Sequence, residues 1–160
     1  MSYEIIGETI KSATSIKLGQ IFDNPYRYKE NVTNPKYPCF NIIQVNLSVT
    51  PQQSYGTSIL DNPLKRIQLD YLMNIQYRVA ENTETVTNLQ QQLDEIGLKL
   101  LAEFTELNLE KPTKVKNAYY EKVDGVLQFF YNITVFAIPE IEEENKMETL
   151  DINKNIEEWL

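Results

Sequence analysis

The amino-acid sequence predicts an α+β fold: a mostly antiparallel sheet of about four strands packed against two helices, with an acidic C-terminal extension. Residues 67–79 alternate apolar and polar side chains over thirteen positions, which indicates a strand with one buried face. Residues 86–107 carry apolar side chains at spacings of three and four, the pattern of a helix. Residues 115–123 and 126–138 are two runs rich in aromatic and β-branched residues around Asp124-Gly125, which suits a two-residue type I′ hairpin turn.

The N-terminal elements follow in order. Residues 3–18 repeat isoleucines at helical spacing, and Asp23-Asn24-Pro25 then breaks the helix. Residues 26–32 could form a short strand. Residues 39–49 predict the first long strand, in which one face holds Ile43, Val45, Leu47 and Val49 and the other holds Phe40 and Ile42. Either both faces are covered at that end of the strand, or a bulge shifts the register.

The second helix has a predicted start and end. Thr83 or Thr85 could cap its N-terminus, and Pro112 ends the segment. The apolar stripe also fits a coiled coil, but about three heptads without ordered charges favour packing on a sheet.

Composition argues against catalysis. The chain of 160 residues fits one ordinary domain, contains no histidine and has one cysteine, Cys39, at the start of an apolar run. These facts exclude an intrachain disulfide, Ser-His-Asp triads and histidine-ligated zinc. Adjacent acids such as Asp94-Glu95 or Glu142-Glu143-Glu144 are typical of solvated faces. We therefore predict no enzyme activity, no cofactor and no metal.

Charge is concentrated in one part of the chain. The net charge is −8, and residues 140–160 hold eight acidic residues and two lysines, a net −6. Such a protein lacks the clustered cations needed to grip nucleic acid. No run is long and apolar enough for a membrane span, and the N-terminus lacks the features of a signal peptide, so we expect synthesis in a cytoplasm. We divide the chain into a domain of residues 1–139 and an acidic extension of residues 140–160.

Two segments are candidate interaction surfaces. Residues 50–63 form a long loop for a compact domain, and long loops are often functional. The extension ends with apolar residues at helical spacing that could dock on a neighbouring subunit; packing on the chain's own domain and disorder are the alternatives. The candidate contact residues are Gln53, Tyr55, Ile59, Leu60, Ile152, Ile156, Trp159 and Leu160.

The hairpin predicts an apolar surface that needs a cover. Tyr120, Phe130 and Phe136 are expected on the face opposite Phe129 and Tyr131. Exposed, such a face would promote aggregation. A homo-oligomer would cover it, and so would the extension or the long loop of the same chain.

The hairpin also carries a resemblance. Asp124 to Phe136, DGVLQFFYNITVF, resembles the D-G-x-L-x-F-F strand near the end of the phage tail terminator family, found in tailed phages and phage-tail-like bacteriocins of Gram-positive bacteria. Pro38-Cys39-Phe40 is similar to the opening of that family's first core strand. The order of elements over about residues 3–138 agrees as well, whereas the long loop and the extension depart from the family pattern.

The resemblance implies a structural role in the tail of the virion or bacteriocin particle, assembled in the bacterial host. Tail terminators form a ring or collar, typically a homohexamer, that caps the head-proximal end of the tail tube and stops its polymerisation. The implied partners are the tail tube protein, the sheath protein if the tail is contractile, and a neck or head-completion protein in a phage. DNA would pass only as cargo. The alternative is a neck connector or tail-completion protein of the same particle.

Overall fold

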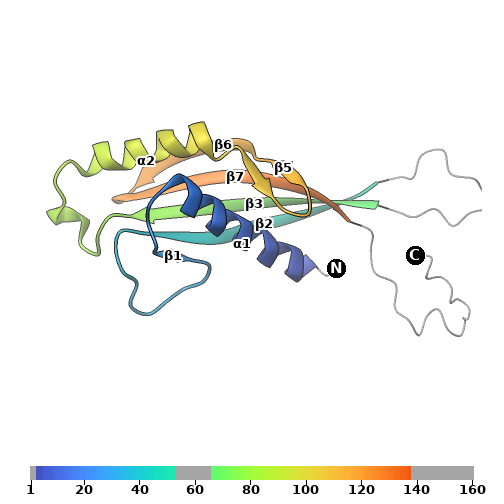
Figure 1. The fold of residues 1–160 in the computed structure, drawn as a ribbon, viewed down its shortest axis with the longest axis horizontal. Coiled ribbons are helices and arrows are strands. Elements are labelled where there is room, and N and C mark those ends of the chain that lie inside the picture. Colours follow the sequence, from blue (N-terminus) through green and yellow to red (C-terminus); the bar gives the residue numbers. More distant parts are fainter. Residues whose placement is uncertain (1–2, 53–65, 138–160) are drawn as a thin grey trace, which may run out of the picture. The chain divides into compact units, whose positions relative to one another are not determined.

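The computed structural model describes residues 3–52 and 66–137, and the side chains of residues 6–51 and 67–137. These residues form the predicted α+β fold (Figure 1). The elements are α1 (Tyr3–Ile21), β1 (Arg27–Tyr28), β2 (Cys39–Gln52), β3 (Arg66–Arg78), the 3-10 helix η1 (Thr83–Thr85), α2 (Leu89–Glu103), β4 (Glu106–Asn108), β5 (Pro112–Lys114), β6 (Lys116–Val123) and β7 (Val126–Ala137).

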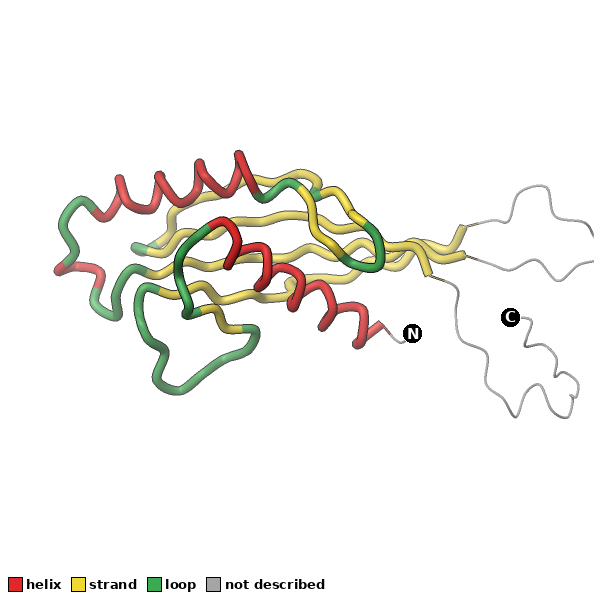
Figure 2. Tube along the Cα trace, in the orientation of Figure 1, coloured by secondary structure: helices red, strands yellow, loops and turns green. Residues whose placement is uncertain are grey.

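The described strands form a five-stranded sheet in the order β1-β2-β3-β7-β6 and a separate two-stranded sheet of β4 and β5 (Figure 2). The four long strands are those predicted. The fifth, β1, is the short strand expected near residue 26, and it runs parallel to β2. The β4–β5 pair was not predicted. Its first strand, β4, begins where the apolar spacing suggested the last turn of a helix, and β5 begins at Pro112.

The predicted hairpin is confirmed. Val123 pairs with Val126, and both intervening residues have positive φ, 52° at Asp124 and 76° at Gly125, as a type I′ turn requires. A Cβ added at Gly125 would lie 2.7 Å from the Thr83 hydroxyl. The turn therefore needs glycine both for its backbone conformation and for its close approach to η1.

Both helices cover the same face of the sheet. Thr14 on α1 hydrogen-bonds the Tyr131 hydroxyl of β7 over 2.6 Å. Phe104, at the end of α2, packs edge-on against Phe129 and Tyr131. The largest fully buried side chains form the core under these helices, and they include Tyr71, Tyr131, Phe40, Phe104, Phe129, Ile10, Leu18, Ile42, Leu69 and Met73.

The second helix is shorter than predicted. It begins at Leu89 because Asn88 adopts a left-handed conformation, φ 57°, and it ends before Phe104. The predicted threonine caps are wrong. Asn82 caps η1 by accepting from the Glu84 amide, and Asn88 makes no side-chain cap bond to α2. Leu107 is buried as predicted, but it lies in β4.

Strand pairing corrects one predicted face. Tyr119 pairs with Phe130, and Tyr120 pairs with Phe129. Opposed residues of an antiparallel pair share a face, so Tyr120 lies on the helix-covered side with Phe129. Tyr119 lies on the uncovered face with Phe130, where the sequence had placed Tyr120. The cause is the two-residue turn, which sets each even-numbered residue of β6 opposite an odd-numbered residue of β7 and the reverse. The register irregularity lies beyond these pairs, between Lys116 and Tyr119.

The described residues belong to two compact units. The larger comprises Ile6–Leu47 and Tyr71–Ile133. The smaller includes residues 3–5, 48–52, 66–70 and 134–137. The predicted boundary at residues 139 and 140 falls outside the described residues. Neither described helix is both long enough and apolar enough to span a bilayer.

Candidate interaction surfaces

The contact residues predicted from the sequence all fall outside the part of the chain that the structure describes. Four belong to residues 53–65 and four to residues 138–160. They are Gln53, Tyr55, Ile59, Leu60, Ile152, Ile156, Trp159 and Leu160. Their proposed contacts therefore stay predictions, and the described residues offer other surfaces.

The uncovered face of β2 carries an apolar stripe. Phe40 and Ile42 point toward the helices and are buried. The alternate residues Ile43, Val45 and Leu47 consequently lie on the opposite face. Ile43 and Leu47 are half-buried, and Val45 is 48% exposed. At the residue 39–42 end, where the sequence suggested either covering on both sides or a bulge, Cys39, Phe40 and Ile42 are buried and Asn41 is half-buried.

Neighbouring strands of the larger unit continue this face. The Tyr119 ring of β6 stacks on Phe130 of β7 with centroids 5.2 Å apart, and Tyr119 is 51% exposed. A polar link joins Gln76 of β3 to Gln128 of β7 over 3.2 Å. The face is therefore a mixture of aromatic, aliphatic and amide side chains, the composition of a protein-binding surface rather than of a core.

The smaller unit has a polar network of its own. Asp70 accepts from Thr134 Oγ1 over 2.6 Å through one carboxylate oxygen and from Gln68 Nε2 over 2.8 Å through the other. Val49 and Phe136 are exposed in the same unit. Since both Asp70 oxygens are engaged, the network links β3 to β7 at these strand ends.

One edge of β2 lacks a full partner strand. β1 pairs with it only through Arg27↔Phe40 and Tyr28↔Asn41. β3 pairs with the other edge of β2. Along residues 42–47, no described strand pairs with the edge on which β1 lies. An edge of this length is a template for pairing with another chain.

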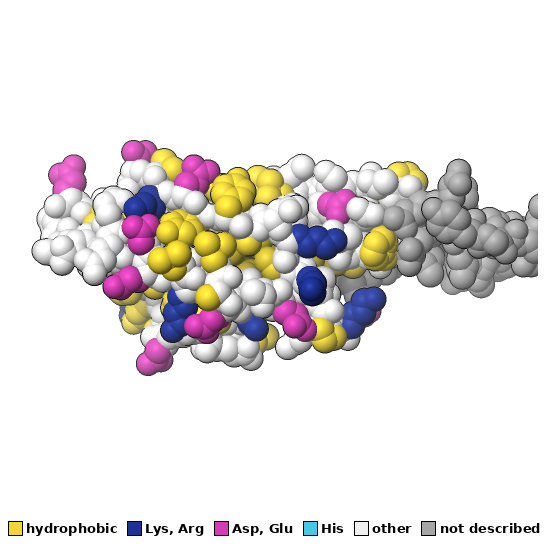
Figure 3. All heavy atoms as spheres, turned by 90° about the horizontal axis from the view of Figure 1, so that it is seen from above, with side chains coloured by type: hydrophobic (Ala, Val, Ile, Leu, Met, Phe, Trp, Pro, Cys, Tyr) yellow, Lys and Arg dark blue, Asp and Glu magenta, His cyan; other side chains and the backbone are white. Residues whose placement is uncertain are grey.

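The outer side of helix α2 forms another described surface. Leu98 and Leu101 on α2 are exposed. Figure 3, which views the molecule from the side of α2 and β6, shows hydrophobic side chains gathered with acidic and basic side chains around them. Exposed apolar groups of this kind suit contact with another protein.

A three-residue cluster ties α2 to β6. Asp94 accepts from Lys122 Nζ and from the Tyr120 hydroxyl, each over 3.0 Å. The hydrogen bond from Lys122 lowers the pKa of Asp94, and that from Tyr120 adds to the effect. Tyr120 lies flat against Gly97, where an added Cβ would come within 2.7 Å of its ring. The cluster thus positions the helix.

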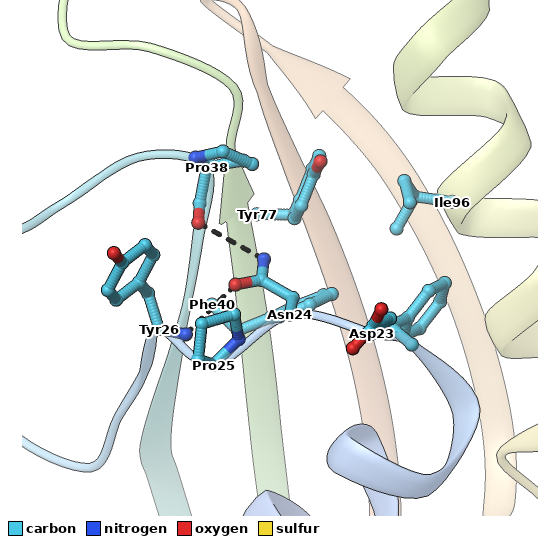
Figure 4. Close-up of a pocket in the computed structure, with 9 residues that line it drawn as sticks. Asp23, Asn24, Pro25, Tyr26, Pro38, Phe40, Tyr77 and Ile96 are labelled. Atoms are coloured by element: carbon cyan, nitrogen blue, oxygen red, sulfur yellow. Dashed lines mark hydrogen bonds between the residues drawn. The ribbon is translucent and has the colours of Figure 1, made fainter.

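An aromatic hollow of about 300 Å³ opens between the residue 22–26 connection, β2, β3 and α2 (Figure 4). Asn24 shapes it: its Nδ2 donates to the Pro38 carbonyl over 3.1 Å, and its Oδ1 accepts from the Tyr26 amide over 2.9 Å. The apolar lining comprises Phe22, Pro25, Tyr26, Pro38, Phe40, Tyr77 and Ile96. Sequence reasoning missed this site, although Asp23-Asn24-Pro25 and Tyr37-Pro38 marked the two breaks that frame it.

The described residues offer no grouping for metal chemistry. No cluster of three or more His, Cys, Asp or Glu side chains that could hold an ion occurs among residues 6–51 and 67–137. Cys39 is buried, and burial raises the pKa of its thiol against a smaller opposing effect of Arg78. The thiol is therefore protonated at neutral pH and poorly nucleophilic.

Comparison with known proteins does not assign this chain to a family. A scan against protein-family models finds no matching family, and a search of curated proteins finds no match.

Proposed function

We propose that this chain is a structural subunit of a phage-type tail that forms a ring on the head-proximal end of the tail tube and ends tube polymerisation. The observation that carries the proposal is the β6–β7 hairpin, in which the Asp-Gly turn leads into the D-G-x-L-x-F-F strand. The described elements also follow the order expected for a tail terminator. The role is one of steric capping, without catalysis.

Ring formation requires self-association, and the uncovered sheet face supports it. Val45 on β2 and Tyr119 on β6 are each about half exposed on that face, and neither helix covers them. The residue 42–47 edge of β2 adds backbone groups that can pair with a strand of a second subunit. A ring would use both features in a head-to-tail contact that closes on itself.

The partners follow from the proposal. One ring face would dock on the tail tube protein, and the other would present no site for a further tube ring. In a contractile tail the ring would also contact the sheath protein, and in a phage it would contact a neck or head-completion protein. DNA would only pass through.

A charge placed on the uncovered face tests self-association. We expect Val45→Glu to weaken association by at least about a hundredfold, because the interface would bury an unpaired carboxylate. The matched control is Ile16→Glu, which puts the same charge on the outer surface of α1, where Ile16 is 62% exposed. Light scattering on the folded variants gives their mass. Equal masses for both variants and the natural chain would contradict an interface on this face.

A further inference from the structure

The aromatic hollow is built for an apolar side chain. Its volume of about 300 Å³ is at the small end for ligand pockets, which suits one large side chain better than a cofactor. The Phe40 ring lies 4.8 Å from Tyr77 and 5.2 Å from Phe22, centroid to centroid. A continuous aromatic wall of this kind binds an inserted ring through offset or edge contacts.

The amide side chain in the wall of the hollow, that of Asn24, is already engaged. Both ends of the Asn24 amide are used in holding the connection to β2 and to Tyr26 (Figure 4). The Tyr26 carbonyl accepts from the Phe40 amide over 2.9 Å. Asp23 is exposed and is the one acid in the lining. The hollow therefore offers mainly shape and aromatic surface, and its rim adds charge.

Two cations flank the rim. Lys99 Nζ lies 5.5 Å from the centroid of the Phe22 ring, and Lys36 Nζ lies 5.9 Å from that of Tyr26. Both lysines are exposed. A ligand that inserts an aromatic side chain while carrying carboxylates beside it would meet both features. Two ammonium groups are too few to hold a nucleic-acid backbone.

The chain itself contains a segment with this chemistry. Residues 140–160 carry a net charge of −6 and include Trp159, the chain's single tryptophan, directly after Glu157-Glu158. Ile152, Ile156 and Trp159 recur at helical spacing. We propose that the hollow binds residues 152–160 of a second copy of this chain, with the Trp159 indole inserted and the flanking glutamates beside Lys36 and Lys99. The inference goes beyond the capping role and does not depend on it.

The single tryptophan provides the assay. The receptor is the full-length chain with Trp159→Ala, and the ligand is a synthetic peptide of residues 145–160, which then supplies the only indole. We expect a saturable blue shift of the indole emission, because insertion removes the ring from water. A peptide with alanine in place of Trp159 should compete at least about tenfold more weakly for the same receptor, since Trp anchors dominate such contacts.

Receptor variants locate the site. Lys36→Glu with Lys99→Glu should weaken peptide binding about tenfold, the product of two rim contacts worth severalfold each. The matched control, Lys111→Glu with Lys114→Glu, makes the same charge change on exposed residues of the β4–β5 region and should leave affinity within about twofold. Ile96→Phe should also reduce binding, because the added ring fills the hollow.

Circular dichroism of each receptor variant establishes that it is folded. No saturable shift at millimolar peptide would overturn the proposal. An equal loss in the rim and control variants would show non-specific charge attraction and would overturn it as well. Binding that survives both the rim reversal and Ile96→Phe would place the segment elsewhere. These outcomes are separate from the mass of the Val45→Glu variant, so the hollow and the ring can fail independently.

Discussion

The buried hydrogen bond between α1 and β7 gives a sharp test of how the helices are held on one face. Thr14 and Tyr131 are both fully buried. The Thr14 hydroxyl donates to the Ile10 carbonyl over 2.8 Å and contacts the Tyr131 hydroxyl over 2.6 Å. A threonine hydroxyl has one proton, so Tyr131 must donate to Thr14. Replacing Thr14 by isosteric valine leaves the phenol buried without its acceptor.

The expected magnitudes follow from that geometry. Thr14→Val should lower the free energy of unfolding by about 1–3 kcal/mol, the cost of a buried unsatisfied polar group. Tyr131→Phe should cost about 0.5–1.5 kcal/mol, because Thr14 keeps its bond to Ile10. The double variant removes both partners and should be more stable than Thr14→Val alone. The double-mutant cycle should therefore give a coupling energy of about 1–2 kcal/mol.

Urea denaturation followed by far-ultraviolet circular dichroism measures all four proteins. Thr87→Val is the control, since Thr87 is exposed, and its midpoint should not move. Costs for the two single variants that simply add in the double variant would refute the assignment of Tyr131 as donor to Thr14. So would a Thr14→Val variant as stable as the natural chain.

Three further predictions concern the turn and the titrating groups. Gly125→Ala should cost about 1–3 kcal/mol in urea denaturation, because the left-handed backbone and the contact with Thr83 both oppose a Cβ; an unchanged midpoint would contradict the turn geometry. Asp94→Asn should lower stability more at neutral pH than at pH 3, because the hydrogen bond from Lys122 lowers the pKa of Asp94, and the resulting contribution is fully present above the unfolded pKa of about 4 and is lost as the pH falls below it; a loss of equal size at both pH values would contradict it. Burial raises the pKa of Tyr131, so its neutral form stabilises the fold fully below the unfolded pKa of about 10, and the stability falls as pH rises above it; Tyr131→Phe should flatten this alkaline loss, and an unchanged slope would count against it.

The sequence predicts most of the elements because their signals are local. The alternation in residues 67–79 became β3 nearly residue for residue, and Asp124-Gly125 formed the turn expected of it. Helix ends were predicted less well. Asn88 takes a left-handed conformation that no N-cap pattern in the sequence predicts. Leu107 is apolar, and that is compatible both with the helical spacing and with its actual position in β4.

Which faces are covered depended on long-range pairing. The sequence placed Tyr120 on the face of Phe130 because both have even numbers, but pairing across the two-residue turn sets Tyr119 opposite Phe130 and so puts Tyr119 on that face. The aromatic hollow brings together the residue 22–26 connection, Tyr77 and Ile96, which are far apart in sequence. No periodicity within one element could have found it, although the proline breaks marked its borders.

The most direct test of the central proposal is electron microscopy of the purified full-length chain mixed with tail tubes, in negative stain. The account predicts rings of several copies, hexameric by the resemblance, each seated on one end of a tube. Rings that ignore tube ends but bind a neck or head component would favour a connector instead. A chain that stays monomeric at high concentration and joins no tube end would contradict the proposed function and leave the fold as described.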